Sequence, residues 1–391
     1  MERLVIVGGG LAAAKAVERL REEGYDGAVT IVGAEGSPPY ERPPLSKDLL
    51  LGKDTDPTVL DAAWWSEHDV QLMTGTRVTA LDREARRVTL DTGERLDYDL
   101  LVLATGAEPR VPDLPGADQA LYLRTLEDKD RILATLESGS RLVIVGAGWI
   151  GLEVAAAARS HDVEVTVLER DDLPLQRVLG DELATHLAAL HRSHGVDLRT
   201  GVTVEEIVLG DDGPVGVRAS GETVEADHVL VAIGAVPSTG LAEESGLEVD
   251  DGIVVDERFQ TADEHVLAIG DVAGSWNVTL EDRLRVEHWD NAIRQGRAVA
   301  DVLLGRDTVH DWYPYFFTDQ FEFSMEYVGR PGAKDTVEIR GDLEANAFIA
   351  YWIDDESRLT AGMNVGIWDV NDTLREMVGT QVDRSELTDL S

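Results

Sequence analysis

The chain has 391 residues, 43% of them hydrophobic, which is enough for two or three globular domains. Its 75 acidic and 35 basic residues give a formal net charge of −40, which disfavours nucleic acid and anionic membranes as partners. Cysteine is absent, which excludes disulfides, dithiol chemistry and thiolate metal sites in this chain.

Two further expectations follow from these bulk properties. The acidic residues are spread along the chain, which favours a role in solubility, such as adaptation to high salt, over a single basic partner. The start, MERLVIV, carries no signal-peptide pattern, and no apolar run approaches the roughly 20 residues that cross a bilayer. We therefore expect a cytoplasmic protein without a membrane segment.

The first predicted element recurs later in the chain. Residues 3–8 and 141–146 both read RLVIVG, and each run predicts a buried strand that ends in glycines. An alanine-rich segment with helical spacing follows each, at 8–20 and 146–158. A strand, a glycine turn and a helix open a dinucleotide-binding unit. The repeat predicts an α/β protein with two Rossmann-like domains.

Three small residues in each copy have different tasks in such a unit. The first allows a tight turn, the second lets backbone amides approach a pyrophosphate, and the third keeps the helix close to the strand. The helix N-terminus then faces the phosphates with unpaired amides and a partial positive charge. In that order, the pairs are Gly8 and Gly146, Gly10 and Gly148, and Ala13 and Gly151.

Each turn is followed, about twenty residues later, by a second strand that ends in an acidic residue. These strands end at Glu35 and at Glu169. A carboxylate at this place accepts hydrogen bonds from ribose hydroxyls and repels a 2′-phosphate. Glu169 therefore favours NADH, while the neighbouring Arg170 leaves NADPH as the alternative.

The later segments extend the pattern. LLVLATGAEP at 100–109 and VLVAIGAVP at 229–237 share a strand followed by Ala-x-Gly-Ala-x-Pro, and the Pro-rich residues 109–118 read as a linker. HVLAIGDVAG at 265–274 predicts a strand that ends at Gly270 and Asp271. Asp271 could accept hydrogen bonds from the polyol chain of a cofactor, or cap the following helix.

The histidines and the aromatic residues lie in two other segments. LATHLAALHRSHG at 183–195 places His186, His191 and His194 on one predicted helix, and no carboxylate completes a metal motif. We expect these three side chains to form a solvated helix face and expect no metal site. Aromatic residues concentrate at 312–327, and the alternation from 337 onward predicts antiparallel strands.

Seven motifs together resemble the FAD-dependent NAD(P)H:ferredoxin reductases, with apoptosis-inducing factor as a more distant relative. They are GGGLAA, PYERPPLSK, ATGAEPR, VGAGWIGLE, AIGDVA, RVEHWDNAIRQG and PYFFTDQF. The resemblance covers nearly the whole chain; Ser238 and Phe317 depart from it, standing where Asn and Trp are common. It implies an FAD domain of residues 1–110 and 240–310, an NAD domain of 111–239 and a C-terminal α+β domain of 311–391.

The resemblance also implies roles for single residues. Lys47 ends the stretch YERPPLSK, in which Pro43 and Pro44 make a stiff track and bias Arg42 toward extended geometry. In the family this lysine lies beside the flavin and pairs with a glutamate, here Glu153. Its ammonium would stabilise the negative charge that a hydride brings to the ring. Lys47 and Glu153 are thus the expected catalytic residues.

The expected cofactor contacts form two sets, and no metal ligand is expected. Those for FAD are Gly8, Gly10, Leu11, Ala12, Ala13, Glu35, Arg42, Lys47, Val78, Ala104, Thr105, Gly106, Arg124, Gly270, Asp271, Glu287, His288 and Trp289. Those for NAD are Gly146, Gly148, Ile150, Gly151, Glu169, Arg170, Arg177 and Gly234.

The implied activity is electron transfer. A hydride would pass from NADH to FAD, and single electrons would then pass to a 2Fe-2S ferredoxin or a rubredoxin of an oxygenase system. The enzyme would be a monomer or a homodimer. Disulfide reductases and NADH peroxidases share the fold but need a redox-active cysteine, which this chain lacks. A slow redox sensor resembling apoptosis-inducing factor and a monooxygenase are the alternatives.

Overall fold

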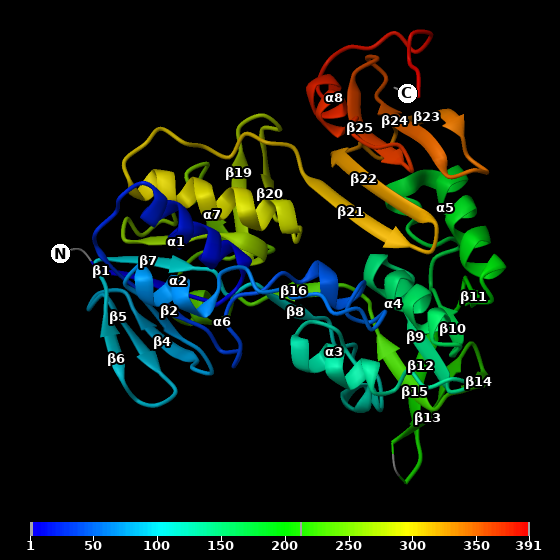
Figure 1. Ribbon diagram of the computed structural model, residues 1–391, viewed down its shortest axis with the longest axis horizontal. Coiled ribbons are helices and arrows are strands. Elements are labelled where there is room, and N and C mark those ends of the chain that lie inside the picture. The colour runs from blue at the N-terminus through cyan, green and yellow to red at the C-terminus, as the bar shows by residue number, and fades with distance from the viewer. Residues whose placement is uncertain (1–2, 212, 390–391) are drawn as a thin grey trace. The chain divides into compact units, whose positions relative to one another are not determined.

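The computed structural model describes residues 3–211 and 213–389, so the outermost residues of the expected first and third domains lie outside the described residues. The chain forms two compact units. Unit 1 consists of Met1–Glu41, Asp56–Glu108 and Val236–Pro314, and unit 2 of Arg42–Thr55, Pro109–Ala235 and Tyr315–Ser391. Figure 1 labels the elements of both.

Unit 1 is built on a five-stranded parallel sheet with the strand order β18-β7-β1-β2-β3. Its strands are β1 (Arg3–Val7), β2 (Ala28–Val32), β3 (Val70–Met73), β7 (Leu100–Leu103) and β18 (Val266–Ala268). Residues 4–7 of β1 are all buried, because a central parallel strand is covered on both faces. The run of apolar residues in RLVIV follows from that double burial.

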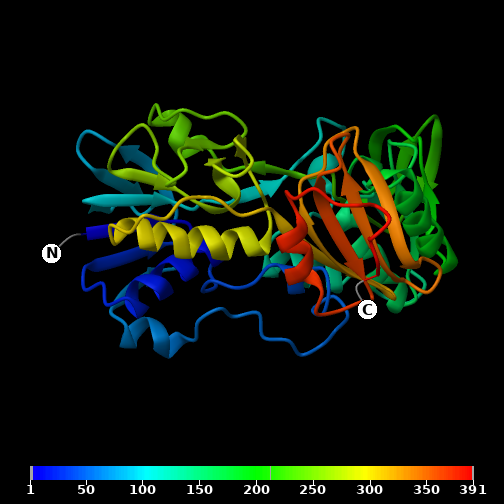
Figure 2. The same cartoon turned by 90° about the horizontal axis from the view of Figure 1, so that it is seen from above.

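Two helices of unit 1 lie against each other, α1 (Leu11–Glu22) and α7 (Trp289–Leu303). The second is the yellow helix in Figure 2. A Cβ added to Gly296 of α7 would lie 2.4 Å from the Ala12 carbonyl oxygen, so this glycine permits the close approach. The two helices join segments far apart in the sequence and share one hydrophobic core.

Smaller elements complete unit 1. An antiparallel sheet consists of β4 (Val78–Asp82), β5 (Arg87–Leu90) and β6 (Arg95–Asp97). A mixed sheet consists of β17 (Ile253–Val255), β19 (Ala273–Asn277) and β20 (Asp282–Leu284). The short helices are α2 (Ala62–Glu67), α6 (Gly240–Glu244) and the 3₁₀ turn η3 (Gly270–Val272).

Unit 2 repeats the plan with a four-stranded parallel sheet in the order β11-β10-β9-β15. The strands are β9 (Arg141–Val145), β10 (Glu164–Leu168), β11 (Asp197–Arg199) and β15 (His228–Val231). The helices are α3 (Leu126–Leu133), α4 (Trp149–Ser160) and α5 (Gln176–Ser193), with 3₁₀ turns η1 (Pro43–Leu45) and η2 (Ala117–Gln119). An antiparallel sheet consists of β12 (Val204–Leu209), β13 (Pro214–Ala219) and β14 (Glu222–Glu225).

The rest of unit 2 is an antiparallel sheet in the order β21-β22-β25-β24-β23, followed by a short helix. The strands are β21 (Tyr315–Gln320), β22 (Phe323–Gly329), β23 (Thr336–Asp342), β24 (Ala347–Ile353) and β25 (Leu359–Val365), and the helix is α8 (Asn371–Met377). Strand β21 contacts α4 along the unit's interior. The antiparallel strands expected from residue 337 onward are confirmed.

The internal repeat is confirmed at the level of strands and helices. The identical RLVIV runs form β1 and β9, and the Ala-x-Gly-Ala-x-Pro segments lead into β8 (Ala107–Pro109) and β16 (Ala235–Pro237). The unit boundaries at 108/109 and 235/236 fall within these two strands, which form a two-stranded sheet. The α/β class with Rossmann-type parallel sheets is therefore present, while the division into three domains stays a prediction.

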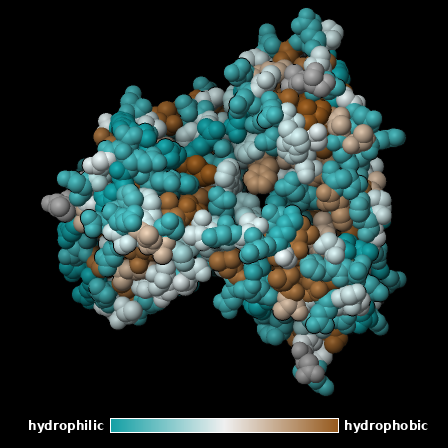
Figure 3. Space-filling view, viewed as in Figure 1, coloured by the Kyte–Doolittle hydropathy of each residue, from teal (hydrophilic) through white to brown (hydrophobic). Residues whose placement is uncertain are grey.

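The surface agrees with the acidic composition. Figure 3 shows a face on which hydrophilic residues predominate and hydrophobic residues occur in small groups. Within residues 3–211 and 213–389, no helix has the length and apolar character needed to pass through a bilayer.

Candidate functional site

The glycine turn of unit 1 has the geometry that its three small residues predict. Gly8 has φ +119°, and a Cβ there would lie 2.0 Å from the Ala104 carbonyl oxygen, so only glycine fits. At Gly10, by contrast, no described atom lies within 4 Å of an added Cβ. Ala13 is fully buried against the sheet. The Ala104 backbone thus packs tightly against Gly8, while the space beside Gly10, where α1 begins, is unobstructed.

The third signature of the sequence lies at the same turn. A Cβ on Gly270 would lie 3.3 Å from the Cβ of Ala12, so the start of α1 and the turn η3 are neighbours. Gly270 donates its amide to Oε1 of Gln295 at 2.7 Å. The Asp271 carbonyl accepts a hydrogen bond from Nη1 of Arg285 at 3.3 Å. Two predicted FAD segments, 258 residues apart in sequence at Ala12 and Gly270, are brought together, and the role of Asp271 stays a prediction.

The residues after β7 are fixed by backbone contacts rather than by a particular side chain. Oγ1 of Thr105 donates to the Ser238 carbonyl at 2.8 Å, and the Ser238 amide donates to the Gly106 carbonyl at 2.9 Å. Ser238, one of the two departures from the family pattern, therefore serves here through its main chain, which any residue except proline supplies. Glu35, expected at the end of the second strand, lies three residues beyond the end of β2, and its carboxylate accepts a hydrogen bond from the Tyr40 hydroxyl.

The remaining predicted FAD residues of unit 1 are distributed over two elements. Val78 begins β4, and His288 and Trp289 are the N-cap and first residue of α7. Glu287 accepts a hydrogen bond from Arg285, the same guanidinium that reaches Asp271. Arg285 thus links Glu287 to Asp271.

A buried polar chain beneath η3 was not expected from the sequence. Gln295, which accepts the Gly270 amide, donates Nε2 to Ser275 Oγ at 3.1 Å, and that hydroxyl pairs with Nδ1 of His310 at 2.7 Å. All three side chains are buried. Burial lowers the pKa of His310 to about 4, so it is neutral. The sequence signal was the motif RVEHWDNAIRQG, which contains Gln295 but does not reveal where its amide points.

The glycine turn of unit 2 repeats the geometry of the first. Gly146 has φ +104°, and an added Cβ would lie 2.4 Å from the Ala232 carbonyl oxygen. A Cβ on Gly151 would lie 2.2 Å from the Gly146 carbonyl oxygen, so the third glycine sets the close packing of α4. At Gly148 the nearest described atom is 4.0 Å away. The neighbouring Ile150 is 47% exposed, although hydrophobic.

Glu169 is held against this turn. Its Oε2 accepts the Ala147 amide at 2.7 Å and its Oε1 accepts the Asp171 amide at 2.9 Å. Each carboxylate oxygen has a second lone pair, so both can also accept a ribose hydroxyl. The side chains of Arg170 and Arg177 are about three-quarters exposed and pair with Asp171 at 3.7 and 3.4 Å.

The ion pair predicted between Lys47 and Glu153 is present in unit 2. Lys47 Nζ lies 2.8 Å from Glu153 Oε1, and the side chains are only 13% and 5% exposed. The same carboxylate accepts hydrogen bonds from Ser46 Oγ and, at 2.5 Å, from Thr318 Oγ1. The ring of Phe317 lies 5.2 Å from Nζ, within cation–π range. The catalytic role of the pair stays a prediction.

The prolines before Lys47 do not hold Arg42 in the expected extended conformation. Arg42 has φ −81° and ψ −30°, a helical rather than extended conformation, and the 3₁₀ turn η1 follows. The Leu45 amide donates to the Arg42 carbonyl at 2.9 Å, which closes this turn. The extended bias before proline is a preference that this hydrogen bond overrides. Arg42 then donates Nη1 to the Arg124 carbonyl, so these two predicted residues meet in unit 2.

The expectation of a solvated histidine face is wrong for His191. This side chain is fully buried and its Nε2 lies 2.9 Å from Gln320 Oε1. His186 pairs with Asn346 at 2.7 Å, and His194 stacks on Phe321 with the ring centroids 3.9 Å apart. The C-terminal sheet covers α5, which helical periodicity alone does not reveal. Among the described residues, no group of His, Asp and Glu is placed to hold a metal ion.

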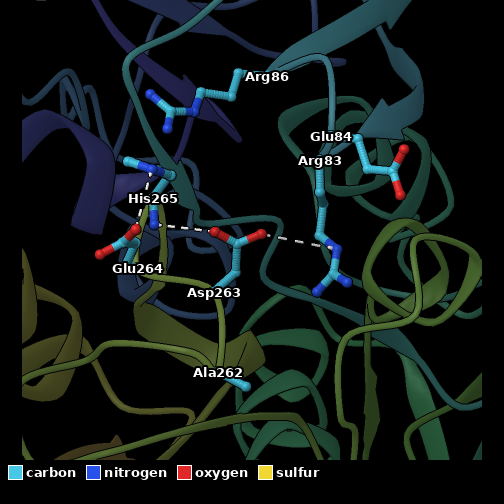
Figure 4. Close-up of a pocket in the computed structure, with 7 residues that line it drawn as sticks. All are labelled: Arg83, Glu84, Arg86, Ala262, Asp263, Glu264 and His265. Atoms are coloured by element: carbon cyan, nitrogen blue, oxygen red, sulfur yellow. Dashed lines mark hydrogen bonds and ion pairs between the residues drawn. The ribbon is translucent and has the colours of Figure 1, made fainter.

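One surface pocket of unit 1 lies apart from the predicted residues. It is lined by Arg83, Glu84, Arg86, Ala262, Asp263, Glu264 and His265, which Figure 4 draws as sticks. Arg83 pairs with Asp263 at 3.8 Å and His265 with Glu264 at 3.6 Å. The opposed charges largely neutralise one another, and none of the predicted site residues lines this pocket.

Both glycine turns fit a dinucleotide. Each has the glycine that closes the turn, an unobstructed position at the helix start, and a carboxylate after the second strand. The open positions at Gly10 and Gly148 are places where a Cβ would stand between the helix amides and a phosphate. Both donor sets therefore suit a dinucleotide, and the assignment of FAD to unit 1 and NAD to unit 2 stays a prediction.

The comparison with protein families decides the relationship. The model of the pyridine nucleotide-disulphide oxidoreductases matches residues 2–296. The chain belongs to this family. Because it has no cysteine, it lacks the thiols after which the family is named.

Individual relatives are similar over most of their length. Rhodocoxin reductase of Rhodococcus erythropolis is 39% identical over 351 residues, 88% of this chain and 82% of the relative. The ferredoxin–NAD(+) reductase component of an anthranilate 1,2-dioxygenase system from Burkholderia cepacia is 37% identical, with 98% and 96% covered. The crystal structure of a covalent putidaredoxin reductase–putidaredoxin complex has a TM-score of 0.93 at 34% identity, with 97% and 94% covered.

The buried His191 generates a prediction about stability. Burial lowers its pKa to about 4, so between pH 6.5 and 4 the unfolded chain binds a proton that the folded chain does not. Stability is lost as the pH falls through this range. His191→Gln keeps a donor for Gln320 and removes the titration. We expect the loss of unfolding free energy from pH 7 to pH 5 to be smaller by about 2 kcal/mol.

Urea titrations followed by circular dichroism at several pH values measure this difference. Wild type and variant should have similar stability at pH 7, where the histidine is neutral in both states. Parallel stability curves between pH 7 and 5 would show that His191 does not contribute.

Proposed function

We propose that the protein is an NADH-dependent, FAD-containing ferredoxin reductase of an oxygenase system. The turn of unit 1 at Gly8 and Gly10 would hold FAD, and the turn of unit 2 at Gly146 and Gly148 would hold NADH, the hydride donor for the flavin. The reducing equivalents then leave one at a time to a 2Fe-2S ferredoxin. The observation that carries this proposal is the Lys47–Glu153 pair at 2.8 Å, buried in a chain that has two nucleotide turns and no cysteine.

The absence of cysteine narrows the chemistry. Disulfide reductases of this fold pass electrons from the flavin to a thiol pair, and this chain has none. The chemistry that FAD supplies when bound is the conversion of a two-electron hydride donor into one-electron deliveries. Such chemistry suits an external one-electron carrier as the acceptor. The similarity to a ferredoxin–NAD(+) reductase component supports this choice of acceptor.

The protein's own contribution is position and charge. The helix starts at Gly10 and Gly148 present amides to the two pyrophosphates. Glu169 orients the adenosine ribose of NADH through its two oxygens, each already fixed by an amide. Glu153 holds the Lys47 ammonium at 2.8 Å, and this positive charge would stabilise the negative charge that a hydride brings to a bound flavin.

A rubredoxin is the second acceptor to test, and a monomer and a homodimer are both compatible with the chain. The proposal keeps the cytoplasm as the location, in line with the absence of cysteine, which leaves the protein independent of an oxidising compartment.

The activity test is anaerobic reduction by NADH followed by titration with purified ferredoxins. We expect rapid bleaching of the flavin absorbance, then stoichiometric reduction of a 2Fe-2S ferredoxin, two per NADH, because each accepts one electron. A rubredoxin serves as the alternative acceptor. A long-lived NADH complex with little onward transfer would instead favour a slow redox sensor, and rapid peroxide formation in air would favour a monooxygenase.

The role of Lys47 is tested by Lys47→Met, which keeps the length of the side chain and removes its charge. We expect hydride transfer from NADH to slow roughly 10- to 100-fold, with a lower flavin midpoint potential, because the reduced ring loses a stabilising charge. Stopped-flow reduction at saturating NADH measures the rate. Lys53→Met, which removes an exposed lysine paired with Asp48, is the matched control. An unchanged rate in Lys47→Met would remove this residue from the mechanism.

The nucleotide preference is tested by Glu169→Ala. We expect kcat/KM for NADH to fall about tenfold or more and the preference to move toward NADPH, because two charged acceptors and a repulsive charge are lost. The exposed Arg170 and Arg177 then face the 2′-phosphate without that carboxylate. Glu164→Ala, at the opposite end of β10, is the control. An unchanged NADH/NADPH ratio would contradict the assignment of Glu169.

A further inference from the structure

The Glu153 carboxylate is the end of a buried hydrogen-bond chain that crosses unit 2. Thr318 Oγ1 lies 2.5 Å from Glu153 Oε1, Gln320 Nε2 lies 3.1 Å from Thr318 Oγ1, and His191 Nε2 lies 2.9 Å from Gln320 Oε1. Each of the four side chains is at most 5% exposed. Strand β21 carries Thr318 and Gln320, and lies between α4 with Glu153 and α5 with His191 (Figure 1).

The donor and acceptor groups of these side chains allow the hydrogen bonds of this chain to run in one direction only. Carboxylate oxygens only accept, so the Thr318 hydroxyl donates to Glu153 and must accept from Gln320. The amide nitrogen of Gln320 is its only donor, so its oxygen faces His191 and accepts from Nε2. Every proton in the chain is therefore donated toward the carboxylate.

The state of His191 agrees with this direction. With its proton on Nε2, the ring is neutral and Nδ1 is bare; Nδ1 has no hydrogen-bond partner among the described residues. Burial lowers the pKa of His191 to about 4, which keeps the ring neutral at physiological pH. The hydrogen-bond chain from His191 thus holds the Glu153 carboxylate without bringing a second positive charge to it.

The carboxylate is fixed at both oxygens. Oε1 accepts from Thr318 and from Lys47 Nζ, while Oε2 accepts from Ser46. A carboxylate bound at one oxygen alone can turn about its terminal bond, whereas one bound at both cannot. Besides Lys47 itself, two hydroxyls therefore fix the carboxylate, and that of Thr318 is 165 residues from Glu153 in sequence.

We propose that Thr318, Gln320 and His191 are positioning residues for Lys47: their directional hydrogen-bond chain holds the Glu153 carboxylate, and through it the ammonium that acts on the flavin. This inference rests on the proposed function of Lys47. None of the three residues needs to touch the cofactor. They act by limiting where the lysine charge can be.

The first test removes the Thr318 hydroxyl. Thr318→Val keeps the shape of the side chain, and we expect it to slow flavin reduction at saturating NADH about tenfold, less than Lys47→Met does, with an unchanged Kd for NADH. Thr318→Ser restores the hydroxyl and should restore most of the rate. Thr360→Val is the matched control, because Thr360 also donates to a carboxylate, that of Asp335, within the same sheet. If Lys47→Met is slow, a Thr318→Val rate equal to wild type would overturn the proposal.

The second test asks whether Thr318 acts through Lys47. In a Lys47→Met background, Thr318→Val should cause no further slowing and no further change in flavin midpoint potential, because the charge that it positions is gone. Multiplicative effects of the two substitutions would mean that Thr318 acts independently, which overturns the proposal. Gln320→Leu breaks the hydrogen-bond chain one step further from the Glu153 carboxylate. It should slow flavin reduction less than Thr318→Val does.

The third test reads the lysine itself, without turnover. The chain has five lysines, so reductive methylation with ¹³C-formaldehyde gives five sets of lysine signals beside that of the α-amino group, and single substitutions assign them. Thr318→Val should move or broaden the Lys47 signal alone, and Thr360→Val should leave it in place. An unmoved Lys47 signal overturns the positioning chain, whatever the activity.

The failure of this inference can be told apart from the failure of the proposed function. If Lys47→Met reduces at the wild-type rate while Thr318→Val still moves the Lys47 signal, the positioning chain stands and the catalytic role of Lys47 falls. If Lys47→Met is slow and Thr318→Val is wild type in both rate and signal, the positioning chain falls and the catalytic role stands.

Discussion

The buried Glu153 carboxylate forms hydrogen bonds that connect the three separate segments of unit 2. Glu153 comes from the segment Pro109–Ala235, Ser46 and Lys47 from Arg42–Thr55, and Thr318 from Tyr315–Ser391. Removing a partner from a buried ion costs several kcal/mol, because the charge loses water without replacement. All three segments must therefore be in place before Glu153 is satisfied. The site and the assembly of unit 2 depend on the same interaction.

Comparison of the two repeats shows that this carboxylate is not needed for the nucleotide turn. When β1 and β9 are aligned, Lys15 of α1 occupies the place of Glu153 in α4. Lys15 pairs with Glu18, one turn along the same helix, at 2.9 Å. The shared strand, turn and helix therefore tolerate either charge at this position. Glu153 differs because unit 2 brings a lysine and two hydroxyls to it from outside the repeat.

The sequence predicted those features that depend on neighbours in the chain. The strands, the glycine turns and the acids at Glu35 and Glu169 follow from local patterns, and Gly8 and Gly146 have the positive φ that the turn requires. The Lys47–Glu153 pair came from the resemblance. His191 was misjudged and Gln295 and Gln320 were missed, because their burial depends on strands or helices far away in sequence. Helical periodicity places His191 on a face, but only the C-terminal sheet decides that this face is covered.

Neutral side chains suit the task of holding a functional charge. Glu153 and Lys47 together carry no net charge, and a charged residue behind the carboxylate would change the potential at the lysine as well as its position. Thr318, Gln320 and a neutral His191 transmit position through hydrogen bonds without adding charge. Unit 1 has a similar buried hydrogen-bond chain beneath η3, in which Gln295 donates to Ser275 and Ser275 pairs with the neutral His310. In unit 1, Gln295 fixes the Gly270 amide and reaches the neutral His310 through Ser275. In unit 2, Gln320 fixes the Thr318 hydroxyl and is itself held by the neutral His191. Neutral groups thus set the geometry in each unit, while the charges of unit 2 are those of the Lys47 ammonium and its carboxylate.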